Sequence, residues 1–122
     1  MRKFLTLVSL LLMPLATTAA QAHASLDHAS PVVGSTVPAA PQEVALTFTQ
    51  NLEPAFSTVQ VTDTSGTRVD QGKAQVSGNT MTIGLKALGP GSYTIEWRVL
   101  SVDTHVTDGV LRFTVGPARS SR

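Results

Sequence analysis

Apolar and polar residues alternate along several short segments of the chain, and a period of two is typical of β-strands that are buried on one side. The alternation is clear in residues 43–49, 58–63, 92–100 and 110–115. β-Branched residues are frequent in these segments, and no window shows a sustained helical period. We therefore predict a strand at each of the four segments.

Turn-forming residues separate the predicted strands. Ser77-Gly78-Asn79 lies between two further segments, 73–76 and 80–85, which predicts a β-hairpin. Residues 23–41 contain too many prolines and glycines for a helix. Short strands joined by such turns predict an all-β fold, an immunoglobulin-like antiparallel β-sandwich or Greek-key barrel of about seven strands.

The apolar side of the predicted strands indicates which residues form the core. We expect the following residues there: Val44, Leu46, Phe48, Ile83, Tyr93, Ile95, Trp97, Val99, Leu111 and Phe113. Trp97 is interpreted as a core residue and not as a functional aromatic. Tyr93 follows a Pro-Gly turn and is a candidate for the tyrosine-corner hydrogen bond of such sandwiches.

Residues 1–22 have the organisation of a secretory signal peptide, with a basic start, an apolar run and a small-residue end. The apolar run is too short to span a bilayer comfortably, and no second apolar run follows it. We therefore expect the protein to be exported and released, with residues 23–122 forming one domain that does not span a membrane.

Two cleavage sites fit the small-residue end. Cleavage after Ala20-Gln21-Ala22 would leave His23 as the first residue of the exported protein. The overlapping Ala22-His23-Ala24 also fits the pattern and would remove the histidine. Composition does not choose between these two sites.

Charge and cysteine content narrow the function classes. The full chain has a formal net charge of +1, and removal of Arg2 and Lys3 with the signal peptide changes this to −1. No basic cluster remains of the kind that binds nucleic acid. The chain has 0 cysteines, so a metal would have to be held by nitrogen and oxygen atoms.

Asp103 and His105 follow the most strand-like segment of the chain and are two residues apart. If the segment is extended, their side chains project to the same side and can close on one ion without bending the backbone. The pair alone is a weak signal, and on spacing alone a solvated loop with an aspartate that caps a turn is the favoured interpretation. We expect both side chains at the end of the sandwich, and we interpret residues 106–109 as the turn into the last strand.

The His-Ala start at His23 and the segments 91–99, 101–105 and 109–115 together resemble the CopC family of small periplasmic copper-binding proteins. The resemblance covers the whole mature chain and is most specific in residues 93–109, combined with the His-Ala start at His23. It implies an immunoglobulin-like β-sandwich or Greek-key barrel in the periplasm. It also implies a role in copper resistance, trafficking or uptake, with an inner-membrane copper permease or another copper-handling protein as a possible partner.

The resemblance further implies one Cu(II) per chain, held by His23, Asp103 and His105. An N-terminal histidine offers its amine and its imidazole to one metal, and His105 completes three nitrogens in a histidine brace. Asp103 adds an oxygen and a negative charge. Such tetragonal nitrogen and oxygen sites suit Cu(II), which binds most tightly among the divalent ions, whereas Ni(II) and Zn(II) bind the same atoms more weakly.

Other polar residues have simpler interpretations. His28 is a further ligand, an outer-shell partner or a surface histidine, and we favour the last two. Asp27 and Glu53 are expected to be solvated, although either could orient an imidazole. Met81 lies in a predicted strand and is expected in the core, so the sequence does not support a Cu(I) site.

Three functions remain open at the level of the sequence. The first is a copper carrier that performs no catalysis. The second is a copper-dependent oxidative enzyme of the histidine-brace type, although an Asp ligand would occupy coordination space that oxygen activation needs. The third is a β-sandwich interaction module without a metal. We expect the carrier and no enzyme.

Overall fold

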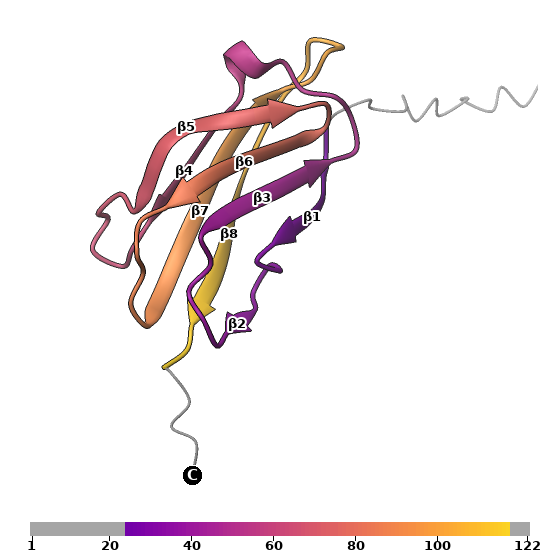
Figure 1. The fold of residues 1–122 in the computed structure, drawn as a ribbon. Coiled ribbons are helices and arrows are strands. Elements are labelled where there is room, and N and C mark those ends of the chain that lie inside the picture. Colours follow the sequence, from indigo (N-terminus) through magenta and orange to yellow (C-terminus); the bar gives the residue numbers. More distant parts are fainter. Residues whose placement is uncertain (1–23, 118–122) are drawn as a thin grey trace, which may run out of the picture.

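The computed structural model describes residues 24–117 of the chain. These residues form two four-stranded β-sheets (Figure 1). One sheet has the order β1-β3-β6-β5 and the other β2-β8-β7-β4. The strands are β1 (Leu26–Ser30), β2 (Thr36–Val37), β3 (Glu43–Phe48), β4 (Thr58–Thr62), β5 (Asp70–Ser77), β6 (Thr80–Leu85), β7 (Gly91–Leu100) and β8 (Val106–Val115). The predicted all-β sandwich is confirmed.

Neighbouring strands pair antiparallel throughout, except for the short parallel contact between β2 and β8. The predicted hairpin is present, since Gly78 and Asn79 connect β5 to β6. Gly78 has a φ of 59°, a left-handed conformation that glycine adopts without a steric cost. Within residues 24–117 the chain has no helix with the length and hydropathy that crossing a membrane requires. The predicted signal peptide and His23 lie outside the described residues.

The sequence interpretation missed β1 and β2 and placed the start of β8 too late. The pairing of β1 with β3 shifts between Leu26 and His28, and this irregularity interrupts the alternation that would have revealed the strand. Residues 106–109 were interpreted as a turn, but they belong to β8 and continue its pairing with β7 as far as Leu100. Gly109 indicated a turn in the sequence, whereas in the structure it lies opposite Trp97 and leaves room for the indole.

The core lies between the two sheets and agrees with the predicted set, apart from Leu111, which is only partly buried. Met81 is fully buried, as expected. The rings of Phe48 and Trp97 meet edge to face with centroids 5.0 Å apart. The hydroxyl of Tyr93 donates to the carbonyl of Gly89 at 2.6 Å, which confirms the predicted tyrosine-corner bond.

A buried carboxylate joins the edges of the two sheets. The side chain of Asp70, at the start of β5, is only 4% exposed. Its Oδ1 accepts from the amide of Val61 in β4 at 2.8 Å and from Arg68 Nε at 2.9 Å, and its Oδ2 accepts from Arg68 Nη2 at 2.7 Å. Hydrogen bonding to Arg68 holds the pKa of Asp70 below its ordinary value, although burial acts to raise it.

Replacing Asp70 with asparagine is expected to lower the free energy of unfolding by about 1.5–3 kcal/mol, the range for hydrogen bonds to a charged group. Because the folded-state pKa is the lower one, this contribution is present above about pH 4 and is lost as the pH falls through the folded-state pKa. Denaturant unfolding of Asp70→Asn at neutral and acidic pH measures both effects. Asp27→Asn is the matched control, because Asp27 is 62% exposed and should change stability little. Equal stability of the two variants at neutral pH would contradict this account of Asp70.

Candidate metal centre

Asp103 and His105 lie in the turn between β7 and β8, at one end of the sandwich (Figure 1). The connection between β3 and β4, which includes a short 3-10 helix (Pro54–Phe56), lies at the same end. The amide of Val102 donates to the carbonyl of Asn51 at 3.1 Å, and Leu52 forms an isolated bridge with Ser101. The turn is therefore supported by a neighbouring loop and is not an isolated hairpin tip.

The backbone of this segment is a tight turn and not an extended strand. The amide of Ser101 donates to the carbonyl of His105 at 2.9 Å, and the amide of Thr104 donates to the carbonyl of Ser101 at 2.9 Å. Thr104 has a φ of 72°, in the left-handed region that residues with a branched Cβ seldom adopt. The sequence argument that the two side chains meet because the strand is extended is therefore wrong. They meet because the chain reverses, with His105 Nδ1 3.4 Å from Asp103 Oδ1.

The two oxygens of Asp103 have different surroundings. The hydroxyl of Ser101, a fully buried residue, donates to Oδ1 and also contacts the carbonyl of His105 at 3.2 Å. This bond from Ser101 is the main cause that lowers the pKa of Asp103, with smaller contributions from His105, while burial acts to raise it. Oδ2 is buried and has no hydrogen-bond partner among the described residues. A buried carboxylate oxygen without a donor is costly, so this atom is a candidate metal ligand.

The donors are partly open to solvent. The side chain of His105 is 50% exposed and that of Asp103 is 31% exposed, while Asp103 Oδ2 itself is buried. Their pairing at the end of the sandwich agrees with the sequence prediction. Within residues 24–117 no group of three or more His, Cys, Asp or Glu side chains is arranged to hold a metal.

The first described residue lies beside the strand that begins just after His105. Ala24 is fully buried, and its carbonyl accepts from the hydroxyl of Thr107 in β8 at 2.7 Å. The next residue is also held, because the amide of Ser25 donates to Thr49 Oγ1 at 3.0 Å and the amide of Thr49 donates to the Ser25 carbonyl at 2.9 Å. The predicted ligand His23 lies outside the described residues. One peptide bond joins it to this anchored segment.

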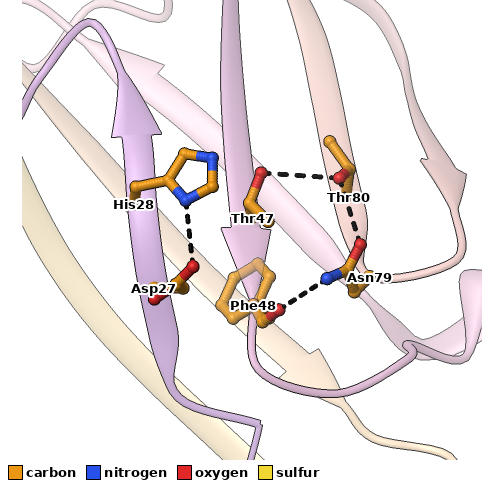
Figure 2. Close-up of polar contacts among 6 residues, drawn as sticks. All are labelled: Asp27, His28, Thr47, Phe48, Asn79 and Thr80. Carbon is orange, nitrogen blue, oxygen red and sulfur yellow. Dashed lines mark hydrogen bonds and ion pairs between the residues drawn. The ribbon is translucent and has the colours of Figure 1, made fainter.

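His28 lies elsewhere, on β1. Figure 2 shows its ring facing Asp27 and near Thr47 on the adjacent strand, and His28 Nδ1 is 3.1 Å from Asp27 Oδ2. The side chain of His28 is 68% exposed. Within residues 24–117 it is not part of any group of three or more His, Cys, Asp or Glu side chains that could hold a metal. This position agrees with the interpretation of His28 as a surface histidine.

Sequence reasoning missed the residues that hold the predicted ligands in place. Ser101 precedes Asp103 by two residues, but a serine before a turn is too common to indicate a buried hydrogen bond. The contact of Thr107 with Ala24 joins residues 83 positions apart and leaves no local pattern. The one available signal for Ser101 was its parity with Val99, which places it on the buried side of the strand.

Comparisons with known proteins agree with this fold. The family model described as the CopC domain matches residues 26–116. Copper resistance protein C of Pseudomonas syringae pv. tomato is 36% identical over 110 residues, which cover 83% of this chain and 86% of that protein. Copper transport protein CutJ of Bacillus subtilis is 34% identical over 101 residues, which cover 80% of this chain but only 19% of that protein.

A solved structure is also similar. The crystal structure of CopC from Methylosinus trichosporium OB3b superimposes with a TM-score of 0.74 at 34% sequence identity. The superposition covers 82% of this chain and 100% of that one. The β7–β8 region lies within residues 26–116, which the family model matches.

Proposed function

The chain belongs to the CopC family, and from this membership we propose that it binds one Cu(II) ion in the periplasm through His23, Asp103 and His105. The observation that carries the proposal is the β7–β8 turn, which brings Asp103 and His105 together and leaves one buried carboxylate oxygen without a donor. In this proposal cleavage after Ala22 makes His23 the first residue of the exported protein.

The chemistry of the donors supports Cu(II). Asp103 supplies a carboxylate oxygen and His105 an imidazole, and His23 would add a second imidazole and a terminal amine. Cu(II) favours such nitrogen and oxygen ligands in tetragonal geometry. Cu(I) favours thiolates and thioethers, but the chain has 0 cysteines, and Met81 is fully buried in the core. We therefore expect Cu(I) to bind far more weakly than Cu(II).

The anchoring of Ala24 supports the participation of His23. The carbonyl of Ala24 accepts a hydrogen bond from Thr107, which is two residues beyond His105. The described chain therefore begins beside β8, the strand that follows the turn with Asp103 and His105. A first residue attached at this point could present its amine and its ring toward Asp103 and His105. This placement supports a chelate that an internal histidine such as His28 could not form, because its backbone nitrogen is an amide.

The proposed role is that of a carrier that holds or delivers the ion and performs no catalysis. The carboxylate of Asp103 would occupy coordination space that an oxygen-activating brace needs. CutJ is described as a copper transport protein, and the matching region is about one-fifth of its length. This relationship supports the proposal that the present chain passes copper to a membrane permease or another copper-handling protein.

Substitution of the described histidines separates the proposed ligand from the surface residue. His105→Ala is expected to weaken Cu(II) binding by more than the roughly 10- to 100-fold that loss of an outer-shell partner costs. His28→Ala, the matched control, should leave the affinity within about twofold, because solvated surface groups contribute little. Competition titration against a chelator of known affinity measures both. Unchanged affinity in His105→Ala, or an equal loss in His28→Ala, would contradict the proposed site.

A further inference from the structure

Ser101 is a buried polar residue at a position where the strand pattern calls for an apolar one. It comes directly after the end of β7 and continues the inward parity of Val99, and both residues are fully buried. Burying a hydroxyl is unfavourable unless it is hydrogen-bonded. The Ser101 hydroxyl has Oδ1 of Asp103 and the carbonyl of His105 as acceptors. Both atoms are part of residues that we propose as metal ligands.

The backbone of Ser101 is held independently of its side chain. Its amide donates to the carbonyl of His105, its carbonyl accepts from the amide of Thr104, and Leu52 bridges it from the neighbouring loop. The backbone of Ser101 is therefore fixed, and its buried hydroxyl has Asp103 Oδ1 as its charged acceptor. Because the carboxylate is charged, it is a stronger acceptor than the backbone carbonyl.

We propose that Ser101 is a positioning residue that holds Asp103 through Oδ1 and thereby presents Oδ2 to the metal. Without the hydroxyl, the carboxylate could rotate about its terminal bond and exchange its two oxygens. With it, Oδ1 is occupied by Ser101 and faces His105 Nδ1, while Oδ2 is the oxygen without a partner among the described residues. The inference rests on the proposed Cu(II) site and adds which oxygen binds and which residue selects it.

Ser101→Ala tests the inference with Thr104→Ala as the matched control. Both remove one hydroxyl from the same turn, but the Thr104 hydroxyl donates to the backbone carbonyl of Asp103 and does not contact the carboxylate. Ser101→Ala is expected to weaken Cu(II) binding about 10- to 100-fold, as loss of an outer-shell partner does, and to shift the electron paramagnetic resonance parameters of the bound ion. Thr104→Ala should change neither by a comparable amount.

A second arm asks whether Ser101 acts through Asp103. In an Asp103→Ala background, Ser101→Ala should cause no further loss beyond about twofold, because the two residues act as one unit. If the losses of affinity in the two single variants simply added in the double variant, the inference would be overturned. Wild-type affinity in Ser101→Ala would also overturn it. In both cases the wild-type protein would still bind Cu(II), so the proposed function would stand. Wild-type protein that binds no Cu(II) would overturn both proposals.

A measurement on the metal-free wild type keeps the inference testable if Ser101→Ala fails to fold. Nuclear magnetic resonance should detect a Ser101 hydroxyl proton that exchanges slowly with solvent and correlates with the Asp103 carboxyl carbon. A hydroxyl proton that exchanges rapidly and shows no correlation with the Asp103 carboxyl carbon would overturn the inference without any reference to copper.

Discussion

A single glycine added before His23 is expected to lower the affinity for Cu(II) by at least about 100-fold. This is the largest loss that substitution of an outer-shell residue usually causes. The addition leaves the imidazole, Asp103, His105 and the whole described core unchanged. It converts the basic terminal amine into an amide, and the chelating pair of nitrogens at the first residue is lost. Chelator competition on the extended and native proteins measures the difference.

The best control for this experiment is the extended protein itself. Enzymatic removal of the added glycine restores His23 as the first residue and should restore the affinity in the same preparation. Intact mass verifies each form, and thermal unfolding of the two metal-free forms should coincide, because an added terminal residue has little effect on folding. Equal Cu(II) affinity before and after removal would show that the terminal amine is not a ligand.

Gly109→Ala is expected to reduce the free energy of unfolding by about 1–3 kcal/mol, the usual cost of overpacking a core. A Cβ at Gly109 would lie 2.5 Å from Cζ2 and 2.9 Å from Nε1 of Trp97. The indole also packs against the ring of Phe48, with centroids 5.0 Å apart, which limits its movement. Relief requires β8 to move away from β7, and both strands hold the turn that carries Asp103 and His105.

Gly89→Ala provides the matched control for Gly109→Ala. A Cβ at Gly89 meets no atom within 4 Å, and the carbonyl that accepts from Tyr93 is retained. Thermal unfolding should therefore shift by about 4–8 °C per kcal/mol in Gly109→Ala and much less in Gly89→Ala. Trp97 is the single tryptophan of the chain, so its fluorescence reports the expected displacement directly. Coincident unfolding curves for the two variants would contradict the close contact between Gly109 and Trp97.

The fold was largely predictable because one side of most strands is buried. Val44, Leu46 and Phe48 alternate with more exposed residues in β3, and Ile95 and Trp97 do the same in β7. The alternation of apolar and polar residues does not reveal a strand whose residues are not buried alternately. In β1 the register shifts beside His28, and in the first part of β8 no residue is fully buried, so both segments were assigned incorrectly.

The proximity of Asp103 and His105 was predictable from the sequence, but the backbone geometry that produces it was not. Asp103 and His105 were selected by spacing and family resemblance, yet the extended backbone that was expected to unite them is a turn with Thr104 in a left-handed conformation. Such a turn depends on support from Asn51 and Leu52, which are far away in sequence. The role of Ser101 depends on the same turn, and no local pattern encodes it.

We propose that one Cu(II) binds to a nitrogen-rich site that includes the first residue of the exported chain. Titration of protein beginning at His23, monitored by electron paramagnetic resonance, tests it most directly. The account predicts a single axial Cu(II) signal with nitrogen superhyperfine structure that saturates at one ion per chain. Two tight sites, no binding, or a signal without nitrogen coupling would contradict it.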